Sequence, residues 1–347
     1  MNAQVVAFFN NKGGVGKTSL VYHLAWMYAE MGSRVVAADF DPQANLTAAF
    51  LDQEELEAVW SDDDRSRTVF GCVQPIMKGT GDIGDPHLEL ADERLALLIG
   101  DLALSGFEDD LSGVWPDCMD GKERGFRVIS AFWRIMQEAA RKHRASVILM
   151  DMGPNLGAIN RAALIGADYV VVPLSPDLFS LQGLRNLGPT LRKWRGEWEA
   201  RIAKNPAKDL SLPRGSMEPA GYVVLQHSVR LDRPVKAYEK WIARIPRDYQ
   251  EYVLGGKTQA SLLPQDDPNC LAQLKHYRSL MPLAQEARKP IFSLKPADGA
   301  IGGHMGSVRA VYEDFEGLAR AILTRIGVDE PTMRPTPPTL FETPRTP

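Results

Sequence analysis

The sequence has few of the residues that build disulfide-stapled, membrane-spanning or strongly cationic proteins. Its three cysteines, Cys72, Cys118 and Cys270, are far apart and odd in number, which argues against a disulfide framework or a CxxC site. No apolar run is long enough to span a membrane, and the N-terminus lacks a signal-peptide pattern. The net charge of −4 excludes a polycation, so nucleic-acid binding would need a local basic patch or one doubled by dimerisation. We therefore expect a cytoplasmic protein.

The remaining composition is ordinary for a soluble globular protein. Hydrophobic residues make up 44% of the 347 residues and charged residues 24%. A chain of this length can build a substantial core, as one large α/β domain or as two smaller ones. Composition does not narrow the function further, so the motifs must.

A glycine-rich stretch, FFNNKGGVGKTS from Phe8 to Ser19, is the first chemically specific feature. It follows an apolar strand at residues 5–9 and precedes a helical run at residues 19–31. Strand, glycine loop and helix start together favour a phosphate cradle over a loop that only turns, because backbone N–H groups converge on anionic oxygens. Lys17 is placed to reach the β- and γ-phosphates, and the Thr18 hydroxyl to bind Mg²⁺. The residues expected to bind nucleotide here are Gly13, Gly14, Val15, Gly16, Lys17, Thr18 and Ser19.

This loop departs from the general G-x-x-x-x-G-K-[ST] pattern in a way that points to one family. Asn11 occupies the first glycine position, and Lys12 directly precedes the glycines. The resulting K-G-G-x-G-K-[ST] form resembles the deviant Walker A loop of the ParA/MinD branch of P-loop ATPases. The resemblance implies a doubly wound, mostly parallel α/β sheet flanked by helices, which binds ATP and Mg²⁺ and hydrolyses ATP. It also implies a homodimer formed on ATP binding, in which Lys12 contacts the partner subunit's nucleotide.

A second signature follows the next apolar strand, at residues 34–38. In parallel sheets, ligands bind at the carboxyl ends of strands, and this strand ends in Asp39 and Asp41. The run DFDPQANLTA resembles the family's D-x-D-P-Q-x-N-x-T. The resemblance implies that Asp41 orients the attacking water and that Asp39 supports the Mg²⁺ shell. The plainer alternative is that both carboxylates cap the strand end or the next helix.

A third signature is the apolar strand at residues 146–151, which ends in Asp151 and resembles a Walker B strand. By that match Asp151 lies near the Mg²⁺ and the attacking water. The family continues with T-P-P, whereas this chain has Met152-Gly153-Pro154 and so lacks the threonine hydroxyl. The helix expected at residues 158–166 resembles one that relays nucleotide state to the dimer face, with Asn160 as the candidate contact.

Basic residues recur along a helix expected from residue 179 to about residue 198, after a strand and turn that resemble the family's A-D-x-V-[IL]-[IV]-P-x-x-P. Several of them can share one helix face. In the ParA branch such residues bind DNA phosphates without sequence preference, and the alternative is an ordinary solvated face. The candidates are Arg185, Arg192, Lys193 and Arg195, with Arg201 beyond them.

The C-terminal third resembles the family only weakly. By the resemblance, the adenine contacts follow a strand at residues 222–226 and lie in a loop at residues 280–291, which makes Gln226 and Pro282 the candidates. Apolar spacing predicts a closing helix at residues 308–326 and an earlier one at residues 126–143. Trp115, in the divergent middle of the chain, is either a partner-facing aromatic or a cover for the edge of the core.

We expect one P-loop ATPase domain over residues 1–328. Within it, residues 52–125 diverge from the family, and loops are inserted near residues 203–219 and 246–268. The tail, residues 329–347, is rich in threonine and proline and is expected to be disordered. It does not resemble the basic membrane helix that ends MinD proteins, so no membrane partner is expected. No helix-turn-helix precedes the P-loop, so operator binding is not expected either.

Three functions remain open. The leading hypothesis is a ParA-like ATPase whose ATP-bound dimer binds DNA non-specifically, is released by partner-stimulated hydrolysis and positions plasmid, chromosome or other cargo. The stimulating partner would be ParB-like or specific to its system, and the protein would associate with the nucleoid. The second hypothesis is an ATP-dependent dimeric switch that regulates a secretion, polysaccharide or defence complex without moving DNA. The third is a metabolic relative, either an iron–sulfur reductase or an ATP-using ligase.

Overall fold

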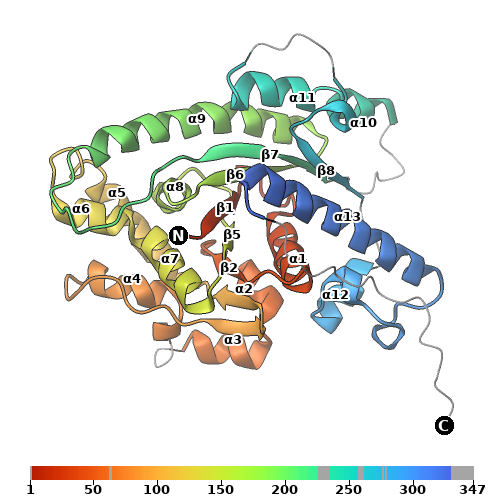
Figure 1. The fold of residues 1–347 in the computed structure, drawn as a ribbon, viewed down its shortest axis with the longest axis horizontal. Coiled ribbons are helices and arrows are strands. Elements are labelled where there is room, and N and C mark those ends of the chain that lie inside the picture. The colour runs from red at the N-terminus through yellow and green to blue at the C-terminus, as the bar shows by residue number, and fades with distance from the viewer. Residues whose placement is uncertain are drawn as a thin grey trace.

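The described residues form one mixed sheet of eight strands, which runs through the middle of the molecule in the order β3-β4-β2-β5-β1-β6-β7-β8 (Figure 1). The structure is a computed structural model, and it describes residues 2–61, 65–225, 235–256, 262–275, 277 and 280–329. The strands are β1 (Gln4–Phe8), β2 (Val35–Asp39), β3 (Glu89–Asp92), β4 (Leu95–Leu98), β5 (Val147–Asp151), β6 (Tyr169–Leu174), β7 (Glu218–Leu225) and β8 (Cys270–Leu274). Neighbouring strands are parallel, apart from the antiparallel pair of β3 and β4. The predicted fold class is confirmed.

Helices cover both faces of this sheet, as Figure 1 shows. The α-helices are α1 (Lys17–Glu30), α2 (Asn45–Phe50), α3 (Gln53–Val59), α4 (Val69–Met77), α5 (Glu108–Val114), α6 (Glu123–Ile129), α7 (Ala131–His143), α8 (Ala158–Ile165), α9 (Leu178–Ile202), α10 (Val235–Ile242), α11 (Ile245–Asp248), α12 (Leu280–Ala287) and α13 (Gly303–Ile326). Shorter helical turns are η1 (Arg65–Arg67), η2 (Leu102–Phe107), η3 (Tyr249–Val253), η4 (Pro264–Asp266), η5 (Ile291–Ser293) and η6 (Pro296–Asp298). None of the described helices has both the length and the apolar content needed to cross a bilayer.

The core has two halves because successive strand residues point to opposite faces of the sheet. Val5 and Ala7 of β1 face a cluster built with α4 to α9. Val6 and Phe8 of the same strand face a second cluster, built with α1, α12, α13 and the short helices after β2. The central strands are buried on both faces, which explains why they are almost wholly apolar.

The register of the central strands gathers the predicted catalytic positions at one edge of the sheet. Phe8, the last residue of β1, pairs with Asp151 at the end of β5. On the other side of β5, Asp39 at the end of β2 pairs with the same aspartate. The glycine loop after β1 and the two carboxylates therefore lie side by side, as expected for carboxyl ends of parallel strands.

Two sequence-based expectations about helices were wrong. Residues 126–143 form two helices, α6 and α7, which meet at Ser130, where ψ is −2°. The Ser130 hydroxyl donates a further hydrogen bond to the Phe126 carbonyl, 2.7 Å away, at this junction. The stretch at residues 280–291, expected as a loop, forms α12 before it continues to η5.

The divergent segment, residues 52–125, is more regular than its sequence indicates. Its described residues contribute β3 and β4 to the sheet and contain α3, α4, α5 and the start of α6. Helix α3 begins with a complete capping box between Asp52 and Glu55. Trp115 is 8% exposed and its ring stacks on that of Trp198, with centroids 6.1 Å apart. Of the two roles considered for Trp115, the structure therefore supports the cover of the core edge. The expected disorder of the tail concerns residues that, from 330 onward, lie outside the described part of the chain.

Candidate nucleotide-binding site

The glycine loop turns sharply between the end of β1 and the start of α1. Gly14 and Gly16 have φ angles of 69° and 84°, in the left-handed region that side-chain-bearing residues rarely adopt. A Cβ on Gly16 would also lie 2.9 Å from a methyl carbon of Leu225. Glycine is therefore required at this position both for backbone conformation and for space, while Val15 between them is fully buried.

Lys17, the first residue of α1, is drawn back over the loop. Its Nζ lies 3.3 Å from the Asn10 carbonyl oxygen and 3.4 Å from that of Lys12. The residue is 7% exposed, and burial lowers the pKa of its ammonium group, opposed by the negative charges of Asp151 and Asp41. A phosphate oxygen at the loop would offer this buried cation the anionic partner that the carbonyls do not supply.

Asn10 holds the loop in place, a role that sequence reasoning missed. Its side-chain amide donates to the Pro173 carbonyl at 2.7 Å, and its side-chain oxygen accepts from the Lys12 N–H at 3.0 Å. The residue is 1% exposed. The loop is thus tied to the end of β6, a contact that no local pattern reveals because the partners are 163 positions apart.

Lys12, the extra lysine of the motif, is paired within its own chain. Its Nζ lies 2.5 Å from Oδ2 of Asp177, and both side chains are about three-quarters buried, at 27% and 21% exposed. The other oxygen of Asp177 accepts the Ser180 N–H and so caps α9. One carboxylate therefore serves the helix start and the lysine together.

The three aspartates at the strand ends differ in what they contact. Asp39 is fully buried, and its Oδ2 accepts from both the N–H and the hydroxyl of Thr47 at 2.8 Å. Its Oδ1 accepts the Asp41 N–H at 3.2 Å. Asp39 thus holds the start of α2, and its support of the magnesium shell stays a prediction.

The carboxylate oxygens of Asp151 differ from those of Asp39. Both oxygens of Asp151 are buried and accept no hydrogen bond that meets normal geometry among the described residues. Burial raises the pKa values of both Asp151 and Asp39, and the negative charge of Asp151 raises that of Asp39 further. For Asp151, the Thr18 hydroxyl and Lys17 lower the pKa, while the charge of Asp41 raises it. A buried carboxylate with free oxygens beside a hydroxyl fits a cation.

These donors fit Mg²⁺ bound together with a nucleotide. Magnesium sites commonly use one or two carboxylates, with water and substrate phosphates as the other ligands. The described residues contain no group of three His, Cys, Asp or Glu side chains that could hold a metal by themselves. Thr18 and Asp151 are therefore the residues that would hold the ion, with phosphate oxygens supplying further ligands.

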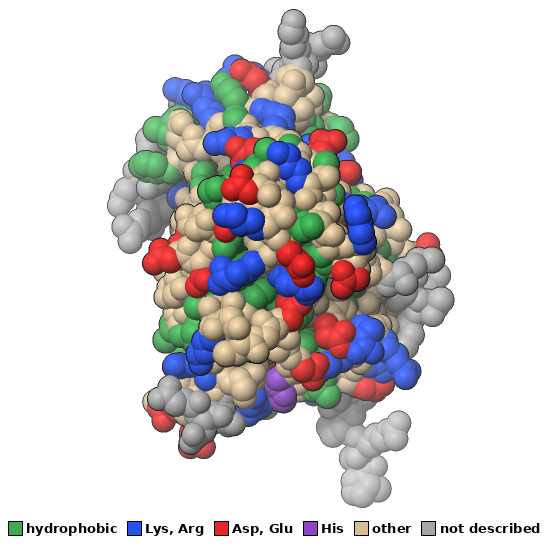
Figure 2. All heavy atoms as spheres, turned by 90° about the vertical axis from the view of Figure 1, so that its left-hand side faces the viewer, with side chains coloured by type: hydrophobic (Ala, Val, Ile, Leu, Met, Phe, Trp, Pro, Cys, Tyr) green, Lys and Arg blue, Asp and Glu red, His purple; other side chains and the backbone are tan. Residues whose placement is uncertain are grey.

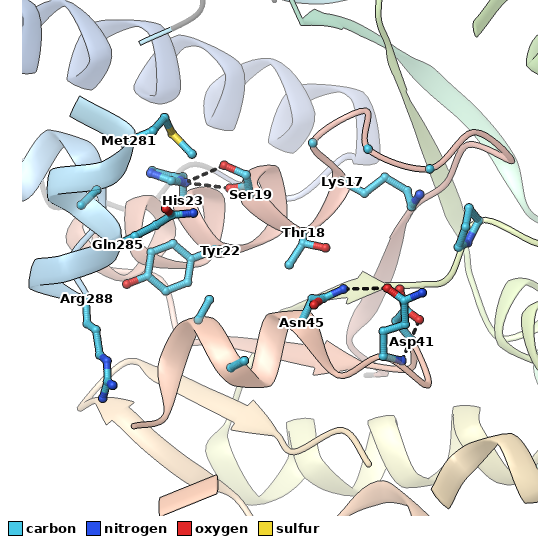
Figure 3. Close-up of a pocket in the computed structure, with 18 of the residues that line it drawn as sticks. Lys17, Thr18, Ser19, Tyr22, His23, Asp41, Asn45, Met281, Gln285 and Arg288 are labelled. Atoms are coloured by element: carbon cyan, nitrogen blue, oxygen red, sulfur yellow. Dashed lines mark hydrogen bonds between the residues drawn. The ribbon is translucent and has the colours of Figure 1, made fainter. Parts of the chain in front are cut away.

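A cavity of about 740 Å³ opens beside these groups. Figure 3 shows Lys17 and Asp41 reaching the same region from the glycine loop and from the segment after β2, with Thr18 between them. Asp41 is 7% exposed, and its Oδ1 accepts the Gln43 N–H at 3.0 Å. Gly13, Gly14, Gly16, Lys17, Thr18 and Ser19 line the cavity, which brings together most of the predicted nucleotide-binding residues.

The far wall of the cavity is α12, which lies opposite α1 (Figure 3). Pro282 is exposed at the start of this helix, while its neighbours Met281 and Gln285 line the cavity. A smaller apolar hollow of about 130 Å³ adjoins at Gly16 and Ser19 and is closed by Phe315. Its lining is mostly apolar, with Leu225 and Met281 among the side chains. The other predicted adenine contact, Gln226, lies outside the described residues.

The basic residues of α9 mostly bind the protein itself. Arg192 donates to the carbonyls of Tyr252 and Val253 at 3.0 and 2.9 Å, and Arg195 donates to those of Ser216 and Met217 at 2.6 and 2.9 Å. In the same way, Arg185 lies 3.8 Å from Asp248 and stacks on Tyr252, and Arg201 is buried. Lys193 differs, since its side chain is 70% exposed and its nearest carboxylate is 3.9 Å away.

In this mostly parallel sheet, β1 is followed by a glycine loop with two lysines and then by α1. This arrangement defines a P-loop nucleotide-binding protein of the deviant Walker A type. Residues 3–204 match the family model described as an AAA domain (AAA_31). The chain belongs to this family and, within it, to the ParA/MinD type of ATPase.

Curated relatives match a little more than half of the chain. The sporulation initiation inhibitor Soj of Bacillus subtilis is 28% identical over 190 residues, which are 54% of this chain and 65% of Soj. The chromosome partitioning protein ParA of Caulobacter vibrioides is 28% identical over 201 residues, 57% of this chain and 66% of ParA. Matches to other relatives, such as one from Rhizobium rhizogenes, span as little as 42% of the relative. The chain thus spans about two fifths to two thirds of the curated relatives it matches.

Solved structures show the same fold over nearly the whole chain. A protein from Corynebacterium diphtheriae superposes with a TM-score of 0.69 at 24% identity and covers 93% of this chain and 98% of its own. A protein from Borrelia burgdorferi, described as a plasmid partition protein bound to AMPPNP, has a TM-score of 0.57 at 17% identity and covers 93% and 99%. The C-terminal third, where the sequence resemblance is weak, therefore completes the same fold.

Proposed function

We propose that this protein is a ParA-like ATPase that binds ATP with Mg²⁺ and hydrolyses it. One observation carries the proposal: the buried Lys17 lines the cavity beside Thr18, and its charge interacts with that of Asp151, a carboxylate fully buried at the end of β5. A buried cation and a buried anion are each costly unless a ligand satisfies them. Magnesium triphosphate supplies both complements, since phosphate oxygens pair with Lys17 and the metal pairs with Asp151.

Each residue then has a distinct task. Loop N–H groups and Lys17 hold the phosphates, while Thr18 and Asp151 hold the magnesium ion, which when bound neutralises charge that develops on the phosphates. Asp41 faces the cavity with one oxygen held by the Gln43 N–H, so its other oxygen can orient a water for attack. Phosphoryl transfer depends mostly on such positioning and charge organisation.

Dimerisation on ATP binding belongs to the proposal. Two large apolar side chains at the start of α9 are exposed, Leu178 at 51% and Phe179 at 72%. They follow directly on Asp177, which holds Lys12. A second copy that covered this apolar pair would form an interface beside Lys12, and the trans role of this lysine is proposed from the resemblance.

The finer role proposed for the dimer is to bind DNA without sequence preference, to be released by a hydrolysis-stimulating partner and so to position cargo. The name of the Caulobacter relative supports a partition role. Of the four α9 candidates, Lys193 offers the freest contact for a DNA phosphate, because the arginines already have partners in the chain.

The internal pairing of the α9 arginines favours a second candidate function, an ATP-dependent switch for a protein complex. All four expected DNA contacts form hydrogen bonds or ion pairs within their own chain, although the side chain of Lys193 is 70% exposed. On the face that carries α4 to α7, acidic and basic side chains alternate instead of forming one basic surface (Figure 2). Asp82, for example, pairs there with both Arg127 and Arg134. Such a mixed surface suits a protein partner better than a polyanion.

One experiment separates the two candidates. Asp41→Ala protein, expected to bind ATP without turning it over, is tested for binding to a DNA duplex of arbitrary sequence with ATP or ADP across a salt series. Binding only with ATP, weakening steeply with salt, supports the DNA role, and Lys193→Ala should then reduce the salt slope by about 1. An ATP-dependent dimer that ignores DNA supports the protein switch. Failure of the wild-type protein to bind ATP would overturn the ATPase proposal itself.

A further inference from the structure

The loop between β5 and α8, residues 152–157, reaches the proposed site of hydrolysis. Pro154 lines the cavity. The position that a Cβ on Gly153 would occupy is 3.3 Å from Oδ1 of Asp41, so the loop backbone and the candidate catalytic carboxylate are in near contact. The placement of this loop therefore sets the space in which Asp41 can orient a water.

The loop is held from within by its own helix. Asn160, on α8, is 1% exposed and donates to the carbonyls of Gly153 at 2.8 Å and Asn155 at 2.6 Å. The sequence-based expectation that Asn160 contacts a dimer partner is therefore wrong, because its amide group is spent inside the chain. Any shift of α8 would carry the loop with it.

Helix α8 is in turn held by a residue from the divergent segment. The carboxylate of Glu108, the first residue of α5, accepts the N–H groups of Ala158 and Ile159 at 2.5 and 2.8 Å, one on each oxygen. The residue that precedes α8, Gly157, has no side chain to cap it. Glu108 thus supplies from 50 positions away the anionic cap that the local sequence lacks.

Glycine at position 157 makes room for this contact. Its φ of −76° suits any residue, so its backbone does not require glycine. A Cβ there would lie 2.6 Å from Oε1 of Glu108 and 3.1 Å from the Asn155 side-chain oxygen. Close approach of the carboxylate is what a larger residue would prevent.

Helix α5, which carries Glu108, is itself held in place by contacts of Trp115 with α8 and α9. The guanidinium of Arg161 on α8 lies 4.4 Å from the ring centroid of Trp115, and that of Arg201 on α9 lies 3.9 Å from it. Arg201 also donates to the Trp115 carbonyl at 3.1 Å. Helix α5 and the tryptophan after it are therefore fastened to both α8 and α9, and Glu108 does not belong to a free surface loop.

We propose that Glu108 is a positioning residue for ATP hydrolysis. It fixes the start of α8, and through α8 the loop at residues 152–157, at the distance from Asp41 that the reaction needs. The divergent segment is then part of the nucleotide machinery, and a ligand that pulled on α5 would change the hydrolysis rate. The inference rests on the proposed ATPase function, and it assigns Glu108 no contact with the nucleotide.

The test compares four single variants of the full chain. Glu108→Ala removes the cap, Glu108→Gln keeps one oxygen acceptor, and Gly157→Ala displaces the carboxylate from the other side. Asp109→Ala, one residue along α5 with an exposed side chain, is the matched control. For each we would measure kcat and KM for ATP, the Kd of a fluorescent ATP analogue, and hydrogen exchange of the backbone at residues 153–162.

We expect Glu108→Ala and Gly157→Ala to lower kcat at least about tenfold while KM and Kd change less than about threefold, because phosphate binding does not involve α8. Glu108→Gln should retain more activity than Glu108→Ala, and exchange at residues 153–162 should rise in the same order. Asp109→Ala should match the wild type.

Each other outcome is decisive. A Glu108→Ala protein whose kcat stays within about twofold of the wild type overturns the inference, as does an equal loss in Asp109→Ala. If Glu108→Ala does not fold, Glu108→Gln and Gly157→Ala decide by the same criterion. Absence of turnover in the wild type would instead overturn the proposed ATPase function, and that result is separate from any difference among the variants.

Discussion

His23, buried on α1 beside the cavity, makes the stability of the fold depend on pH in a predictable direction. The residue is 4% exposed, its Nδ1 donates to the Ser19 carbonyl at 2.7 Å, and its ring stacks on Phe315 at 5.0 Å between centroids. Its Nε2 is buried and has no hydrogen-bond partner among the described residues. Burial lowers the pKa of His23 to about 4, from an ordinary value near 6.5.

Because the folded chain binds the proton less tightly than the unfolded chain, acid favours unfolding. The contribution of His23 to stability is fully present above about pH 6.5 and is lost progressively as pH falls toward about 4. With those two pKa values, His23 alone should remove about 2 kcal/mol of unfolding free energy between pH 7.5 and pH 5.

The assay is urea unfolding of wild type and His23→Asn at both pH values, without nucleotide. Asparagine keeps an N–H donor for the Ser19 carbonyl but does not titrate, so the wild type should lose about 2 kcal/mol more than the variant on acidification. The contributions of all other titrating groups to the change in unfolding free energy cancel when the two proteins are compared. Equal losses in the two proteins would refute the reasoning, since they would show that His23 is not protonated on unfolding in this range.

Three further predictions concern the site and the divergent segment. Lys17→Ala should abolish binding of ATP, and an unchanged Kd in equilibrium dialysis would contradict the P-loop assignment. Lys12→Ala should bind ATP within a few-fold of the wild type yet fail to dimerise on ATP, which light scattering measures; an intact dimer would count against the trans role. Trp115→Ala should lower the unfolding free energy by about 3–5 kcal/mol, whereas Leu102→Ala, at an exposed position, should change it by less than about 0.5 kcal/mol. A small loss for Trp115→Ala would show that its contacts with α8 and α9 are weak.

The strands at the centre of the fold could be predicted because their signals are local. Residues 35–38 and 147–150 are unbroken apolar runs that end in a carboxylate, as strands buried on both faces do. The short helices of residues 52–125 were missed because each spans only a few turns and is defined by caps, such as Thr68 accepting the Gly71 N–H. The break at Ser130 was missed for a related reason, since helix periodicity continues on both sides of it.

The residues of the site likewise fall into those that could be predicted from the sequence and those that could not. Glycine, lysine and aspartate positions within a motif are visible at fixed spacing, and Gly14, Lys17 and Asp41 do line one cavity. The groups that hold these residues in place come from far along the chain, 163 positions in the case of Asn10 with Pro173. No periodicity or spacing encodes such a contact, and only the register of the sheet creates it.

The pairing of Lys12 with Asp177 means that this lysine is never simply available. An anion that binds Lys12, whether it is bound to the same chain or to another, must displace the Asp177 carboxylate, whose Oδ2 is 2.5 Å from Nζ of Lys12. Binding therefore exchanges one counter-ion of the lysine for another. A triphosphate carries more charge than a carboxylate and can win that exchange, while nucleotides with fewer phosphates compete less well. Without Lys12, Asp177 would still cap α9 through Oδ1, and its Oδ2 could accept a hydrogen bond from a molecule bound at that surface. If Lys12 contacts a nucleotide as proposed, discrimination between nucleotide states would begin with the ion pair that it forms inside the single chain.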